Sequence, residues 1–183
     1  LQRDLRVLLR GIDDGRRTFA NTMKYIAITT SANFGNMVSM ALASLGLPFL
    51  PLLAPQILLN NFLSDVPSLA IATDNVDADQ VRAPHHWDIG YVRRFMITFG
   101  LVSSIFDFIT FGFLILLAQA TAEVFQTAWF VESLITELAI VLMVRTRKPF
   151  YKSYPSPLLS WLTLAIALLA VVVPYLPGTG WFG

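Results

Sequence analysis

The sequence contains no cysteine and only two histidines among its 183 residues. The lack of cysteine excludes disulfide bonds and thiolate metal sites. The histidines, His85 and His86, are adjacent, and we expect both to be surface residues because neighbouring side chains rarely chelate one metal without further ligands. Glycine-rich phosphate loops, nucleophile elbows and HExxH signatures are also missing. The sequence therefore carries no motif for catalysis or nucleotide binding.

Charged residues are scarce as well. They make up 14% of the chain, against about 25% in an ordinary soluble domain. Hydrophobic residues make up 55%, and the mean hydropathy is +0.62. The formal net charge of +1 provides no basic face to neutralise phosphates, which argues against nucleic acid as a partner. This composition indicates that the lipid bilayer is the main solvent of the chain.

Five apolar segments are each close to the roughly 20 residues that a helix needs to cross a bilayer. They cover residues 23–45, 56–73, 95–117, 127–144 and 158–173. Asn, Ser, Gly and Asp interrupt the first two, whereas the fifth, LLSWLTLAIALLAVVV, is the most uniformly apolar. We therefore predict an all-α fold, a polytopic membrane bundle of these five transmembrane helices within residues 23–174, with an extracytoplasmic tail at 175–183.

The basic residues all fall on one side of this layout. The 13 Lys and Arg residues are Arg3, Arg6, Arg10, Arg16, Arg17, Lys24, Arg82, Arg93, Arg94, Arg145, Arg147, Lys148 and Lys152. They precede the first segment, lie at its edge, or occupy the second and fourth connections. The first and third connections, GLPFLPLLAP and AQATAEVFQ, contain none. Because cytoplasmic loops are enriched in Lys and Arg, we predict a cytoplasmic N-terminus.

The stretch before the first segment, residues 1–22, carries an apolar stripe opposite its charges. Leu5, Leu8, Leu9 and Ile12 recur at helical spacing, which indicates an amphipathic helix that runs into the membrane as a stalk. Such a stripe needs a soluble partner to cover it, and the chain does not start with Met. We expect the chain to be a piece of a longer polypeptide.

Polar side chains on the first two segments form the candidate functional site, because such groups are costly inside a bilayer and point to function. Asn33 and Asn36 are three residues apart in the first segment. Asn61, Ser64 and Asp65 share one face of the second by their i, i+3 and i, i+4 spacing. Amide, hydroxyl and carboxylate oxygens suit a hard cation such as Mg²⁺, Ca²⁺ or an alkali ion.

Pro67 follows this cluster and leaves a backbone carbonyl without its helical donor. Such carbonyls are tolerated at membrane depth where they line a cavity or an ion site. The small number of carboxylates suits Mg²⁺, which keeps several of its waters. The competing interpretation is that Asn and Ser only join helices by hydrogen bonds. The Asp and the following Pro favour the ion site.

Three further acids, Asp107, Glu132 and Glu137, fall within the predicted spans, where no basic residue is available to pair with them. Each is therefore either an uncharged acid hydrogen-bonded between helices or a group close to the bound cation. Glu137 is near the middle of the fourth segment, and Asp107 could approach the site from the third. The sequence leaves both interpretations open.

Three runs, GRRTFANTMKYI, SANFGN and LLNNFLSDVPSLAIATDNVD, resemble the fifth and sixth transmembrane helices of P-type ATPases. In that family the fifth helix continues from the phosphorylation domain as a stalk, which implies this role for residues 1–22. The NxxSD pattern ending at Asp65 resembles the sixth-helix ion-binding motif, usually NxxTD. Asn33 and Asn36 fall where calcium pumps place an Asn and a Glu, so position 36 departs from that pattern. SSIFDFITF and FQTAWFVESL are similar to the bacterial magnesium-translocating branch.

This resemblance implies part of an ATP-driven pump that moves Mg²⁺ across the inner membrane through an aspartyl-phosphate cycle. The nucleotide, phosphorylation and actuator domains and the first four transmembrane helices would then be partners of this chain, together with the lipid bilayer. We expect the chain alone neither to hydrolyse ATP nor to bind Mg²⁺ tightly. The alternatives are a P-type pump for Ca²⁺ or H⁺, and a non-catalytic channel or scaffold module in the membrane.

Overall fold

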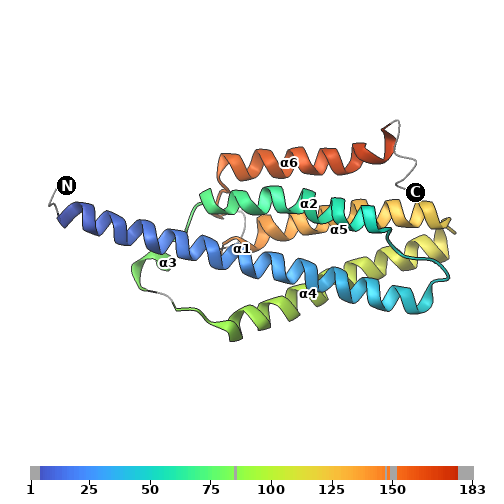
Figure 1. The fold of residues 1–183 in the computed structure, drawn as a ribbon, viewed down its shortest axis with the longest axis horizontal. Helices are drawn as coiled ribbons and strands as arrows, with labels where there is room; N and C mark the ends of the chain where they lie inside the picture. The colour runs from blue at the N-terminus through green and yellow to red at the C-terminus, as the bar shows by residue number, and fades with distance from the viewer. Residues whose placement is uncertain (1–4, 85, 147, 149–151, 177–183) are drawn as a thin grey trace.

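A computed structural model of the chain describes residues 5–84, 86–146, 148 and 152–176, and His85 lies outside them. The described part is helical, without strands (Figure 1). Its elements are α1 (Leu5–Gly46), α2 (Ala54–Ala70), η1 (Ile71–Thr73), α3 (Ala78–Arg82), α4 (Ile89–Gly112), η2 (Phe113–Leu117), α5 (Ala122–Val144), α6 (Pro157–Val172) and η4 (Val173–Tyr175). The predicted all-α fold is confirmed. Each of the five predicted segments falls on one of the helices α1, α2, α4, α5 and α6 or its short extension.

Three of the described helical segments are long and apolar enough to cross a membrane: Ile89–Leu117, Ala122–Val144 and Pro157–Tyr175. Helix α2 has only 17 residues, and Asn60, Asn61 and Asp65 lower its hydropathy. In α1, the charged residues of the N-terminal half and the Ser and Asn residues of the second half also lower the hydropathy. The two helices that depart from an apolar composition are the ones that carry the predicted polar cluster.

Helix α1 is 42 residues long, and its N-terminal part extends past the rest of the bundle (Figure 1). The apolar stripe on this part is open to solvent, with Leu5 80% and Leu8 63% exposed. Because no proline interrupts α1, its projecting N-terminal part and the part packed in the bundle form one continuous helix.

The third predicted span begins earlier than the sequence indicated. Helix α4 starts at Ile89, not at residue 95, because the Asp88 side chain accepts a hydrogen bond from the amide of Tyr91 (2.9 Å) and caps the first turn. At its other end, α4 continues into the π-helical turn η2. The connection before α4 is likewise not wholly irregular, since it contains the short helix α3.

Helix α5 forms the centre of the hydrophobic core. Phe125, Trp129, Phe130 and Leu134 of this helix are each at most 1% exposed. Phe111 of α4 packs edge-on against Trp129, with 4.8 Å between ring centroids. Helices α2, α4 and α6 all pack against α5, with α6 at one edge of the bundle (Figure 1). Helix α5 therefore lies at the centre of the bundle, and its buried polar residues face the surrounding helices.

Helices α1 and α4 cross at two glycines. A Cβ atom on Gly35 would lie 2.9 Å from the backbone oxygen of Gly100, and one on Gly100 would lie 3.0 Å from the backbone oxygen of Ser31. Ser104 completes the contact, because its hydroxyl donates to the carbonyl of Gly35 (3.1 Å). Small residues at such crossings let helix backbones approach closely in membranes. The segment of α1 around Gly35 is therefore packed directly against α4.

The Gly35→Ala substitution should lower the stability of the bundle by about 1–3 kcal/mol, because the added methyl group would overlap the backbone of α4. Gly112→Ala is the matched control, since a Cβ there meets nothing within 4 Å. Thermal unfolding of the two variants in detergent measures the difference. Equal midpoints for both variants would show that the α1–α4 contact is not tight.

A buried polar hub, formed by Asp74 with Lys24, Arg145 and Ser156, joins the helix ends. The Asp74 carboxylate lies 3.1 Å from Nη1 of Arg145 and 3.6 Å from Nζ of Lys24. It also accepts a hydrogen bond from the backbone N–H of Ser156 (3.0 Å). The side chains of Asp74 and Arg145 are 0% and 1% exposed. The hub therefore ties the end of α2 and η1 to α1, to the end of α5 and to the start of α6.

Candidate ion site

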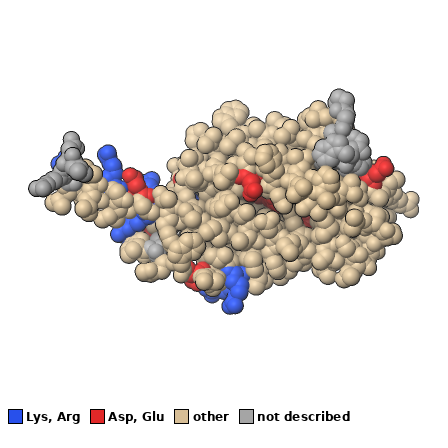
Figure 2. Space-filling view, in the orientation of Figure 1, with Lys and Arg blue, Asp and Glu red and all other residues tan. Residues whose placement is uncertain are grey.

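A groove of about 240 Å³ lies between α1, α2 and α5. Five of the eight residues predicted as metal ligands line it: Asn33, Asn61, Ser64, Asp65 and Glu137. Figure 2 shows acidic atoms at a hollow in the middle of the molecule, where the surface around them is uncharged; the other charged atoms in this view lie toward the ends and along the lower edge. The helical spacing that placed Asn61, Ser64 and Asp65 on one face is thus reproduced by the structure.

The groove is open on the side of α1 and α2 and closed by α5. Asn33, Asn61 and Asp65 are exposed, Ser64 is half-buried, and Glu137 is buried. In the described part of the chain, the Asp65 carboxylate has neither an ion pair nor a hydrogen bond. The Ser64 hydroxyl donates to the carbonyl of Asn61 (3.2 Å) and keeps its lone pairs available. The exposed oxygens are therefore free to contact an ion or its water shell.

Glu137 is held at the inner wall of the groove by amide donors from two helices. Its Oε1 accepts from Nδ2 of Asn36 (2.5 Å) and from Nδ2 of Asn60 (3.3 Å). Asn36 in turn accepts from the hydroxyl of Ser133 (3.1 Å). Asn36 does not line the groove itself, so the structure places it behind the groove, where it orients Glu137.

Asn60 and Ser133 are members of this network that the sequence reasoning did not select. Asn60 is adjacent to the chosen Asn61, but it points to α5, whereas Asn61 lines the groove. Ser133 lies four residues before Glu137, on the same face of α5. That i, i+4 spacing was a signal available in the sequence. The hydrogen-bond partner of Ser133 is Asn36, 97 residues earlier in the chain, and no local pattern indicated this contact.

Asp107 and Glu132 do not reach the groove. Asp107 is 0% exposed and accepts hydrogen bonds from the hydroxyl of Ser39 (2.5 Å) and from Nε1 of Trp129 (2.9 Å). Glu132 accepts from the hydroxyl of Thr136 one turn later in α5 (2.8 Å). The contacts of Asp107 join α1, α4 and α5, as in the alternative of an acid hydrogen-bonded between helices. The contact of Glu132 with Thr136 lies within α5.

The groove has the chemistry of a weakly charged, all-oxygen cation site. No lysine or arginine is among the described residues that line it, so Asp65 and Glu137 are not neutralised by a basic group there. Among the described residues, no three Asp, Glu or His side chains gather at one place. A cation in the groove would therefore be held by amide and hydroxyl oxygens beside at most two carboxylates, as suits an ion that keeps several waters.

His86 is exposed, as predicted, and lines a different pocket at the basic end of the molecule. On the face shown in Figure 2, the basic atoms gather at the end where α1 projects and at the connection below it. No basic atoms are visible on the opposite end of this face. The distribution agrees with a bundle whose two ends face different sides of a membrane.

Comparison with known proteins bears on the identity of the chain. Residues 49–183 match the family model described as cation transporting ATPase, C-terminus. The magnesium-transporting ATPase, P-type 1, of Escherichia coli is 43% identical over 97% of this chain, and one of the same name from Salmonella typhimurium is 37% identical over the same share. A putative cation-transporting ATPase of Methanocaldococcus jannaschii is 26% identical over 91% of the chain.

The chain spans 20% of the length of the E. coli and S. typhimurium relatives. The family model covers α2 and α5, which are two of the three helices that form the groove, and it also covers α4 and α6. The resemblance to the C-terminal transmembrane region of P-type ATPases, drawn from the runs around Asn33 and Asn61, is confirmed. The chain belongs to the cation-transporting ATPase family and forms the C-terminal, membrane-embedded region of that fold.

Proposed function

We propose that this chain forms the ion path of an ATP-driven magnesium pump. The observation that carries the proposal is the groove in which Asn33, Asn61, Ser64 and Asp65 converge from two helices onto the amide-held Glu137. Asp65 supplies the exposed charge that attracts the cation. The amide and hydroxyl oxygens contact the ion or its waters, and Glu137 supports the inner wall.

The charge of the groove favours Mg²⁺ over Ca²⁺, because only two carboxylates among the described residues, Asp65 and Glu137, line it. Ca²⁺ would take six to eight direct oxygen ligands, commonly with more carboxylates. Asn36 lies where a further acid would be expected for calcium, and its amide is used to orient Glu137. The names of the 43% identical relatives support the same ion.

ATP hydrolysis through an aspartyl phosphate would take place in other parts of a longer protein, with the nucleotide, phosphorylation and actuator domains acting on the stalk of α1. The exposed apolar stripe at Leu5 and Leu8 is a surface on which such a domain would pack. We place the N-terminus in the cytoplasm and the bundle in the inner membrane. The gathering of basic atoms at the stalk end supports this orientation (Figure 2).

The Glu137→Gln substitution in the full-length protein should weaken activation by transported Mg²⁺ about 10- to 100-fold, the usual cost of losing a group that supports metal ligands. Glutamine keeps an oxygen that accepts from Asn36 and Asn60, so the network is retained and the charge is removed. The measurement is the Mg²⁺ concentration that half-saturates uptake into vesicles.

Glu132→Gln is the matched control for Glu137→Gln. It makes the same chemical change five residues earlier on α5, at a carboxylate that contacts Thr136 and does not line the groove. We expect half-saturation close to that of the unchanged protein. If both variants shift equally, the effect belongs to the packing of α5, and the groove is not the ion path.

A further inference from the structure

The ion groove continues toward the end of the bundle from which α1 projects. A second hollow, of about 180 Å³, lies between α1, α2 and η1. Tyr25 and Ser68 line both the groove and this hollow, so the two adjoin. The other described residues that line the second hollow are Thr18, Asn21, Thr22, Leu69 and Ala72. We call the groove and this hollow together the α1–α2 seam.

The walls of the seam are polar on both helices. They are formed by residues three or four positions apart, which lie on one face of a helix. This set is Thr18, Thr22, Tyr25, Thr29 and Asn33 from α1, with Asn61, Asp65, Ser68 and Ala72 from α2 and η1. Every member except Ala72 carries a side-chain oxygen. Polar residues on membrane helices commonly face a water-filled cavity and mark the pathway of an ion.

The hydroxyl groups along the seam present acceptors. Thr18, Thr22 and Thr29 each donate a hydrogen bond to the carbonyl four residues earlier in α1, at 2.9, 2.9 and 2.6 Å. Ser68 donates in the same way to the carbonyl of Ser64 in α2 (2.8 Å). A hydroxyl whose one hydrogen is used by the backbone still has oxygen lone pairs. These oxygens are suited to a cation or to the waters around it.

Asn21 brings a buried oxygen without a partner to the far end of the seam. The residue is 4% exposed, and its Nδ2 donates to the carbonyls of Ala72 (3.2 Å) and Asp74 (3.0 Å), which fixes the orientation of the amide. In the described part of the chain, Oδ1 then has no hydrogen-bond partner. A buried acceptor destabilises a fold unless water or a ligand satisfies it. A hydrated ion in the second hollow would do so.

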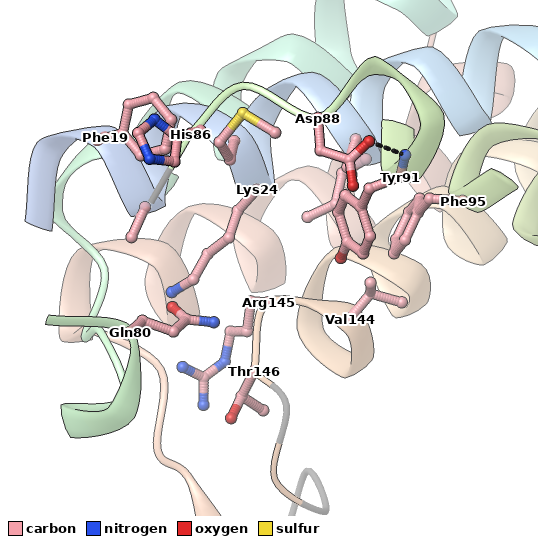
Figure 3. A pocket seen from close by; sticks show the side chains of 14 residues that line it. Phe19, Lys24, Gln80, His86, Asp88, Tyr91, Phe95, Val144, Arg145 and Thr146 are labelled. Atoms are coloured by element: carbon pink, nitrogen blue, oxygen red, sulfur yellow. Dashed lines mark hydrogen bonds between the residues drawn. The ribbon is translucent and has the colours of Figure 1, made fainter. Parts of the chain in front are cut away.

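The charges around the seam favour passage of a cation over its retention. No charged residue is among the described residues that line the second hollow. Lys24 and Arg145 are close in the chain to these elements, but Figure 3 shows both side chains gathered beside Gln80 in a separate cavity. There they share the carboxylate of Asp74. An ion that leaves Asp65 along the seam therefore meets neither a second carboxylate nor a basic side chain in the described lining of the second hollow.

We propose that the α1–α2 seam is the passage through which Mg²⁺, with part of its water shell, moves between the groove and the end from which α1 projects. This inference rests on the proposed function, and in the orientation proposed above that end is cytoplasmic. The ion passes from Asp65 to the hydroxyls of Thr29 and Ser68, and its waters then donate to Oδ1 of Asn21. Because Mg²⁺ loses its waters reluctantly, a lining of uncharged acceptors suits its passage.

Cysteine labelling tests the passage, because the chain contains no cysteine of its own. Ala72→Cys is introduced into the full-length protein, from which any other cysteines are removed, and the protein is reconstituted in proteoliposomes. A positively charged methanethiosulfonate reagent is added on the side that receives ATP. Mg²⁺ transport is measured before and after labelling, so each variant is its own reference. We expect labelling to lower the transport rate about tenfold or more, because a fixed cation then occupies the second hollow, and we expect Mg²⁺ to slow the labelling.

Ala83→Cys is the matched control, since it makes the same change at an exposed residue that follows α3 and does not line the seam. Its labelling should be independent of Mg²⁺ and should leave transport unchanged. Unchanged transport after labelling of Ala72→Cys, or failure of the reagent to label it, would overturn the proposal. If Asp65→Asn loses transport while labelled Ala72→Cys keeps it, the groove stands as the ion path and the seam does not. Transport by Asp65→Asn would count against the groove itself.

Discussion

The Asp65→Asn substitution should abolish growth rescue of a strain that lacks its own Mg²⁺ uptake, when the variant is expressed as the full-length protein. Asp65 is the exposed carboxylate of the groove, and no described basic residue neutralises it there. Loss of a supporting group costs about 10- to 100-fold in metal affinity, so loss of a direct charged ligand should cost about 100-fold or more. Growth at limiting Mg²⁺ is the measurement.

The fold is not expected to suffer from this change, because the Asp65 side chain has no ion pair or hydrogen bond in the described part of the chain. Asp79→Asn is the control, since Asp79 is an exposed acid in α3, far from the groove lining. It should rescue growth fully. Rescue by Asp65→Asn at normal membrane abundance would remove Asp65 from the ion path.

The Asp74→Asn substitution should have the largest effect on stability. It leaves Lys24 and Arg145 buried without their shared counter-ion, and removing one partner of a buried ion pair costs about 3–5 kcal/mol. It also weakens the contact to the amide of Ser156. We expect a lower thermal midpoint in detergent and a lower yield of folded protein in the membrane.

The contrasting variant is again Asp79→Asn. Asp79 forms an ion pair with Arg82 at 3.6 Å, but both side chains are largely exposed, and such pairs contribute little to stability. Its thermal midpoint should equal that of the unchanged protein. A small effect of Asp74→Asn, comparable to that of Asp79→Asn, would mean that the hub does not hold α1, α2, α5 and α6 together.

The arrangement of the spans and much of the groove could be predicted from the sequence because both depend on local patterns. Hydrophobic length indicated the five helical segments of the bundle, and the spacing of Leu5 and Leu8 indicated that the residues before the first segment are helical. Helical spacing was sufficient to bring Asn61, Ser64 and Asp65 to one face. Each of these signals lies within a single helix, so no knowledge of packing was needed.

The contacts between helices could not be predicted in the same way. The partners Asp74 and Arg145 are 71 residues apart, and Asn36 and Glu137 are 101 residues apart. Asn33 and Asn36 looked equivalent by spacing, but Asn33 lines the groove while Asn36 contacts Glu137. The cap at Asp88 extended α4 into a stretch whose polarity had suggested a loop.

The ion path through the groove is tested by Mg²⁺ uptake into sealed proteoliposomes that contain the full-length protein, driven by ATP and followed with a fluorescent Mg²⁺ indicator. We expect ATP-dependent Mg²⁺ accumulation by the unchanged protein, none by Asp65→Asn, and normal accumulation by Asp79→Asn. Accumulation of Ca²⁺ in place of Mg²⁺, or undiminished Mg²⁺ uptake by Asp65→Asn, would contradict it.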